Sequence, residues 1–71
     1  MRAYNEVEWE MLREIRQLGM EMIRYDAWIA RAIHFQHDQQ VEDLLYQREM
    51  TQLRRSIVLR QLWAKRVVVF A

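Results

Sequence analysis

Apolar residues in the first half of the chain recur in steps of four and three. The recurring positions are Val7, Met11, Ile15, Leu18, Met22, Tyr25 and Ile29. After two steps of four, the alternation is that of a heptad repeat, in which one stripe of a helix faces a partner helix. Asn5 and Glu8 have the spacing of a capping box, and Tyr4 and Trp9 that of a hydrophobic staple. The pattern predicts a helix over about residues 5–34.

The second half of the chain repeats this pattern with one charged member. Its positions are Tyr46, Met50, Leu53, Ile57, Arg60, Ala64 and Val67. When the two stripes are laid antiparallel, Leu18 faces Leu53 and the chain reverses over about residues 35–38. Asp38 can then act as the N-cap of a second helix over about residues 39–68. The two stripes together predict an antiparallel helical hairpin.

Further apolar stripes remain beside the two that would pair. They are Leu12, Ile23, Ala30 and Ile33 on the first helix, Val41, Leu45, Leu59, Trp63 and Phe70 on the second, and a third strip of Leu44, Val58, Leu62 and Val69. Two helices share only one interface, so a second chain is needed to cover the rest. We therefore expect one all-α domain over residues 1–71 that dimerises into a four-helix bundle. One long helix in an antiparallel dimer is the alternative, because the turn contains no Gly or Pro.

Composition supports self-association. The chain has 71 residues, of which 52% are hydrophobic, with one Gly, no Pro and no Cys. A core of this size is marginal alone, and without disulfides the remaining stabiliser is a second subunit. Charged or amide side chains interrupt every apolar run before it reaches the length of a membrane span, and the first residues carry acids instead of a signal peptide's basic and apolar regions. We expect a cytoplasmic homo-oligomer, a dimer in the simplest case.

The histidines near the turn are the candidates for metal chemistry. His34, His37 and Asp38 have a spacing that could bring them together on an unbroken helix. Zinc sites in bundles usually draw Glu and Glu-x-x-His ligands from several helices, and that motif does not occur here. Ser56 is the one serine and has no neighbouring histidine. We therefore expect no metal, no cofactor and no enzymatic activity.

The basic residues concentrate in the second helix, although the net charge is only +1. On one broad side of that helix lie Arg48, Arg54, Arg55, Lys65 and Arg66. Apolar residues are interleaved with them, which suits an acidic, partly hydrophobic protein surface better than a phosphate backbone. A nucleic-acid-binding regulator is the alternative. Asp26 and Arg60 lie beside apolar stripes, and we expect both at the rims with their charges in solvent.

Large side chains off the main stripe mark the expected contact surface, because aromatic residues in a charged setting are typical interface anchors. The residues expected to bind a partner are Trp9, Met20, Trp28, Phe35, Arg54, Arg55, Leu59, Trp63, Arg66 and Phe70. The hypothesis is a small non-enzymatic protein-binding module, an adaptor or inhibitor such as phages encode, that acts as a homodimer. A designed helical bundle without natural function is a further alternative, which the irregular use of Met, Gln, His and Trp argues against.

Overall fold

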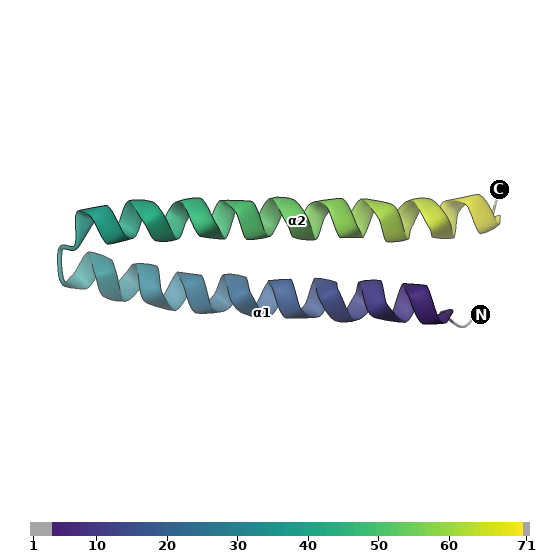
Figure 1. Ribbon diagram of the computed structural model, residues 1–71, viewed down its shortest axis with the longest axis horizontal. Coiled ribbons are helices and arrows are strands. Elements are labelled where there is room, and N and C mark those ends of the chain that lie inside the picture. The colour runs from purple at the N-terminus through teal and green to yellow at the C-terminus, as the bar shows by residue number, and fades with distance from the viewer. Residues whose placement is uncertain (1–3, 71) are drawn as a thin grey trace.

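Two long helices form an antiparallel hairpin. The structure is a computed structural model that describes residues 4–70, with side chains described for residues 4–65. Helix α1 spans Glu6–His34 and helix α2 spans Asp38–Phe70. They lie side by side along their whole length, and both termini emerge at the end opposite the turn (Figure 1). The Cα atoms extend over 51 × 16 × 15 Å. The predicted hairpin is confirmed, and the single continuous helix is wrong.

The start of α1 is fixed by the predicted capping box. The Asn5 side chain accepts a hydrogen bond from the backbone N–H of Glu8 at 2.8 Å. In return, the Glu8 carboxylate accepts one from the Asn5 N–H at 3.2 Å. The rings of Tyr4 and Trp9 meet edge to face with centroids 5.5 Å apart, which forms the expected staple. These contacts satisfy backbone donors that have no partner inside the helix.

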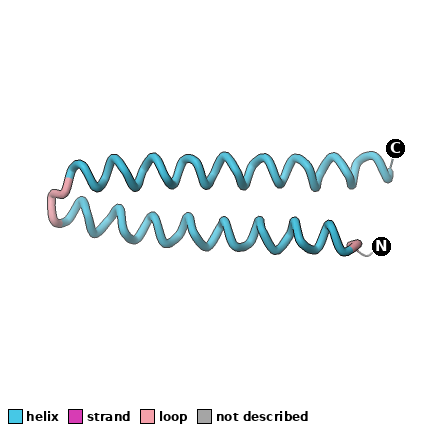
Figure 2. The backbone as a smooth tube through the Cα atoms, in the orientation of Figure 1, coloured by secondary structure: helices cyan, strands magenta, loops and turns pink. Residues whose placement is uncertain are grey.

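The chain reverses without Gly or Pro because Gln36 adopts a left-handed backbone conformation, with φ of 59°. The Gln36 N–H donates to the Ile33 carbonyl at 3.0 Å, and the His37 N–H donates to the Ala32 carbonyl at 2.9 Å. This pair of bonds ends many helices, and the left-handed position is usually glycine. The loop between the helices is correspondingly short (Figure 2).

Helix α2 begins one residue earlier than predicted. The Val41 N–H donates to the His37 carbonyl at 3.0 Å, so His37 holds the N-cap position that was assigned to Asp38. The His37 ring nitrogen Nδ1 lies 3.2 Å from Oε1 of Gln40, at the third helical position. Asp38 stands in the first turn of α2, where its negative charge suits the helix dipole.

The inner face of α1 matches the prediction except at its first position. Ile15 is buried, and Met11, Leu18, Met22, Tyr25 and Ile29 are half-buried. Val7, however, is 49% exposed, and Glu8 is 3% exposed in its place. Seven residues before Ile15, one heptad back along the seam, the chain has Glu8. The predicted stripe took two steps of four instead and so reached Val7, which lies off the seam. Ala32 continues the same face toward the turn and is buried.

The predicted face of α2 is wrong. Its stripe points away from α1, with Tyr46 64%, Met50 47%, Leu53 53% and Ile57 38% exposed. Arg60 and Ala64 are exposed as well, and the side chain of Val67 lies outside the described residues. The residues that face α1 recur with steps of three and four and include most of the third strip: Val41, Leu44, Arg48, Thr51, Arg55, Val58 and Leu62. Helix α2 is therefore turned by about half a revolution from the prediction.

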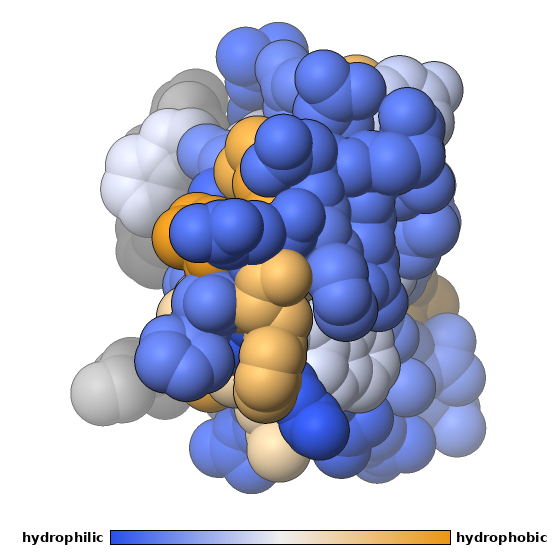
Figure 3. Space-filling view, turned by 90° about the vertical axis from the view of Figure 1, so that its left-hand side faces the viewer, coloured by the Kyte–Doolittle hydropathy of each residue, from blue (hydrophilic) through white to orange (hydrophobic). Residues whose placement is uncertain are grey.

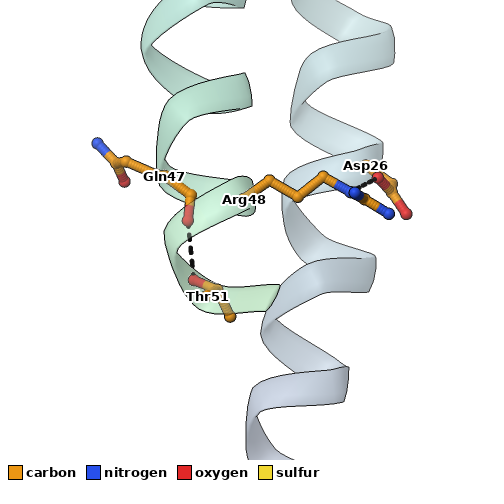
Figure 4. A network of polar contacts seen from close by, with 4 residues as sticks. All are labelled: Asp26, Gln47, Arg48 and Thr51. Carbon is orange, nitrogen blue, oxygen red and sulfur yellow. Dashed lines mark hydrogen bonds and ion pairs between the residues drawn. The ribbon is translucent and has the colours of Figure 1, made fainter. Parts of the chain in front are cut away.

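Polar contacts across the middle of the hairpin explain this orientation. Arg48 extends from α2 to the Asp26 carboxylate on α1 at 2.5 Å, while the Thr51 hydroxyl donates to the backbone carbonyl of Gln47 (Figure 4). Arg55 donates to the Ile15 carbonyl at 3.4 Å. Turning α2 to place its apolar stripe inside would break the contacts of Arg48 and Arg55 with α1.

Tight apolar packing lies toward the open end of the hairpin. Ile15 of α1 packs with Val58 and Leu62 of α2, and Met11 and Leu12 cover this cluster. Near the turn, Ala32 is the one buried apolar residue among those described. The hairpin is thus held by hydrogen bonds at its turn, by polar contacts in its middle and by an apolar cluster near its termini.

Candidate protein-binding surface

A groove runs along one edge of the hairpin, beside the seam. It consists of two hollows of about 560 and 480 Å³ that share Ile15, Arg16 and Arg55. Trp9, Leu12 and Arg13 line the hollow nearer the termini. Gly19, Met20, Met22, Ile23, Asp26 and Arg48 line the hollow nearer the middle. We call this region the edge groove; it unites Trp9, Met20 and Arg55 of the predicted partner-binding residues.

The edge groove combines apolar walls with positive charge. Trp9, Met20 and Ile23 are all more than half exposed. Among its charged residues, Asp26 already pairs with Arg48, so the surplus charge is basic. An added Cβ at Gly19 would lie 3.5 Å from Nε of Arg55, so the arginine lies over the glycine without crowding it. Such a groove suits an amphipathic segment with apolar and acidic residues.

Apolar residues continue this edge toward the turn. Ile33 follows Leu12 and Gly19 at intervals of whole heptads, and it is exposed, as is Leu45 on α2. Viewed from the turn end, apolar side chains gather on one side of the hairpin, whereas hydrophilic ones cover most of the top and the other side (Figure 3). The two long edges of the hairpin therefore differ in character.

Trp28 and Phe35, also predicted to bind a partner, lie at the turn end of the molecule. With Arg31, Ala32, His37, Gln40 and Leu44 they line a separate hollow of about 570 Å³. The Phe35 ring stacks against that of His37 with centroids 6.1 Å apart, and the Arg31 guanidinium lies 6.0 Å from the Phe35 ring centre. Trp28 meets Tyr25 edge to face. Within this hollow the rings of Phe35 and His37 are engaged with each other, and that of Trp28 is engaged with Tyr25 outside it.

The predicted binding residues of α2 are dispersed. Arg54 pairs with Glu14 across the hairpin at 3.0 Å, so part of its charge is used within the chain. Leu59 and Trp63 are exposed, with Trp63 at 71%. Arg66 and Phe70 lie outside the residues whose side chains are described. The structure therefore does not bring the ten predicted residues into one patch.

The stripe on α2 that was predicted to form the core is the main surface that sequence reasoning missed. Tyr46, Met50, Leu53 and Ile57, which we call the outer stripe, face away from α1. The correct inner face had its own heptad signal, with Val41 and Leu44 at one end and Val58 and Leu62 at the other. Arg48, Thr51 and Arg55 interrupt it in the sequence, which made the more continuous apolar stripe look like the core.

The turn histidines stand apart from any cluster of metal-binding side chains. The hairpin turn separates His34, whose ring contacts Phe35, from His37, which contacts Gln40. Within the described part of the chain, no three His, Cys, Asp or Glu side chains are close enough together to hold a metal ion. Nor does any described helix combine the length and hydrophobicity needed to cross a membrane.

Comparison with known proteins yielded no match among family models, curated proteins or solved structures.

Proposed function

We propose that this chain is a non-enzymatic protein–protein interaction module that acts as a homodimer. The observation that supports this most directly is the amount of apolar side chain left in solvent. In residues 4–65, four apolar residues are buried, whereas large apolar side chains are exposed along both helices. Contiguous apolar surface on a small protein is typical of sites that bind another protein.

Two faces could serve two roles. The outer stripe of α2 is a continuous heptad face of the kind by which helices associate. The edge groove combines Trp9 and Met20 with basic side chains, which suits an acidic, partly apolar segment of another protein. An adaptor or inhibitor would use one face to dimerise and the other to bind its target.

The contacts within the hairpin give the nucleic-acid alternative less support. Arg48 pairs with Asp26, Arg54 with Glu14, and Arg55 donates to a backbone carbonyl. Arginines engaged in this way present fewer donors to a phosphate backbone.

The test of self-association is molar mass measured by light scattering over a range of protein concentrations. We expect a mass above that of the monomer at micromolar concentration, since association is favoured by mass action. A Leu53→Ala variant, altered on the outer stripe, should shift this association to higher concentration while its helicity stays unchanged. A monomer that persists at several hundred micromolar would contradict the homodimer.

A further inference from the structure

We propose that a second copy of the chain docks antiparallel on the outer stripe of α2. The proposal rests on the self-association proposed above and specifies the face and the direction of pairing. The outer stripe lies opposite the inner seam, so α1 does not reach it, and its four members are 38–64% exposed. Its spacing and the charges around it determine how a second copy fits and in which direction.

The spacing of the outer stripe allows it to pair with itself in reverse. From Tyr46 the steps are four, three and four residues to Ile57, and a further step of three reaches Arg60. In an antiparallel pair of such stripes, the first core position of one repeat faces the second core position of the other, so Met50 faces Leu53 and Tyr46 faces Ile57 of the second copy. A stripe with this repeat pairs with another by inserting each side chain between four of the facing helix.

Charge along α2 selects the antiparallel direction. Around Tyr46 stand Glu42, Asp43 and Glu49, all exposed, whereas no acidic residue occurs after Met50. Arg60 is exposed at the other end of the stripe. Antiparallel pairing places Arg60 opposite Asp43 of the second copy and beside its Glu42. Parallel pairing would instead place Arg60 against Arg60, and like charges at an interface are unfavourable.

These groups cannot satisfy each other within one chain. Asp43 and Arg60 are about 26 Å apart along α2 at 1.5 Å per residue. The charge pattern of the outer stripe therefore matches a second copy in reverse orientation and not the chain's own fold. Pairing at this stripe gives a row of four helices, α1 and α2 followed by α2 and α1 of the second copy, instead of the compact four-helix bundle. The edge groove stays open in this arrangement.

Cysteine cross-linking tests the pairing directly, because the chain has no cysteine of its own. Under oxidation, a mixture of Tyr46→Cys and Ile57→Cys chains should form the mixed disulfide-linked dimer, whereas neither variant alone should cross-link. The reason is geometric: the two copies of position 46 would lie roughly 16 Å apart along the axis, beyond disulfide reach. Gln52→Cys, exposed on the same helix but off the outer stripe, is the control and should stay unlinked with either partner.

Charge reversal gives a second measurement that does not need a disulfide. Arg60→Glu should weaken dimerisation about tenfold, and adding Asp43→Arg to the same chain should restore most of the affinity. The matched control is Arg60→Glu with Glu10→Arg on α1, which has the same net charge and should not restore it. Circular dichroism of each variant checks that the helices are intact.

The outcomes separate this proposal from the proposed function. Cross-linking of Tyr46→Cys with itself would mean parallel pairing and would overturn the antiparallel arrangement. Self-association without any of these cross-links, and without an effect of Arg60→Glu, would leave the homodimer standing and reject the outer stripe as its interface. A chain that stays monomeric would reject both.

Discussion

At the scale of single residues, interactions within one helical turn could be predicted and the conformation of the turn could not. The Asn5–Glu8 capping box depends on residues three apart, so its signal lies within a few letters of sequence. The left-handed conformation of Gln36 has no such signal, because glutamine is an uncommon residue there. For the same reason the start of α2 was misplaced by one residue, from His37 to Asp38.

Gln36→Gly should stabilise the hairpin by about 0.5–1 kcal/mol. Glycine adopts positive φ without steric cost, and this gain exceeds the extra entropy that it brings to the unfolded chain. The matched control is Gln52→Gly, in the interior of α2, which should destabilise by about 1 kcal/mol. Urea denaturation followed by circular dichroism measures both, and a destabilised Gln36→Gly variant would refute the strained turn.

Gly19→Ala should stabilise α1 by up to about 1 kcal/mol. The added Cβ meets Nε of Arg55 at 3.5 Å, an ordinary van der Waals contact, so the gain in helix propensity is not offset by a clash. Ala27→Gly, at an exposed position of the same helix, is the converse change and should lower the melting temperature. If Gly19→Ala lowered it too, close packing at this glycine would be indicated.

At the scale of elements, the inner face of α1 was predictable and that of α2 was not. Helix α1 has one dominant apolar stripe, and only its first member was misplaced. Apolar residues surround α2 on several sides, so periodicity alone offers more than one face. The choice is made by contacts with residues far away in sequence, such as Arg48 with Asp26 and Arg55 with the carbonyl of Ile15. Local sequence patterns carry no information about these pairs.

Leu62→Ala and Leu53→Ala should therefore have different effects. Leu62 is buried in the apolar cluster, so its truncation should destabilise the hairpin by about 2–5 kcal/mol. Leu53 is 53% exposed, and its truncation should change the stability of the dilute monomer by less than about 1 kcal/mol while reducing association. Denaturation at low concentration and light scattering at high concentration separate the two. Equal losses in the dilute monomer would mean that Leu53 also faces α1.

At the scale of the whole molecule, the hairpin was predictable because each half of the chain has the repeat of a long helix and only a short segment joins them. This holds although the face of α2 was wrong. Self-association also follows from sequence, as a requirement to cover more apolar stripes than one interface can bury, and it stays a prediction. The identity of a partner cannot be read from one chain, because complementarity is a property of two surfaces. Of the predicted binding residues whose side chains are described, seven are exposed and Arg55 is half-buried, and they do not form one patch.

The response to salt should distinguish a protein-binding surface from a nucleic-acid-binding one. Raising salt from about 0.1 M to about 1 M screens the proposed contacts of Arg60 but leaves apolar burial in place, so self-association should weaken by less than about tenfold. Affinity for a short duplex or single strand, if it were the function, would fall by several orders of magnitude over the same range. Tight and steeply salt-dependent binding to either nucleic acid would favour the regulator instead.

The position of the apolar cluster near the termini has a consequence for how the hairpin folds. The turn joins neighbouring residues, whereas Ile15 must find Val58 across most of the chain. Because the entropy lost on closing a loop grows with its length, helical pairing should spread from the turn and reach this cluster last. Contacts made after the transition state affect the rate of unfolding more than the rate of folding. The turn should therefore govern how fast the hairpin forms, and the end that carries both termini should govern how long it stays closed.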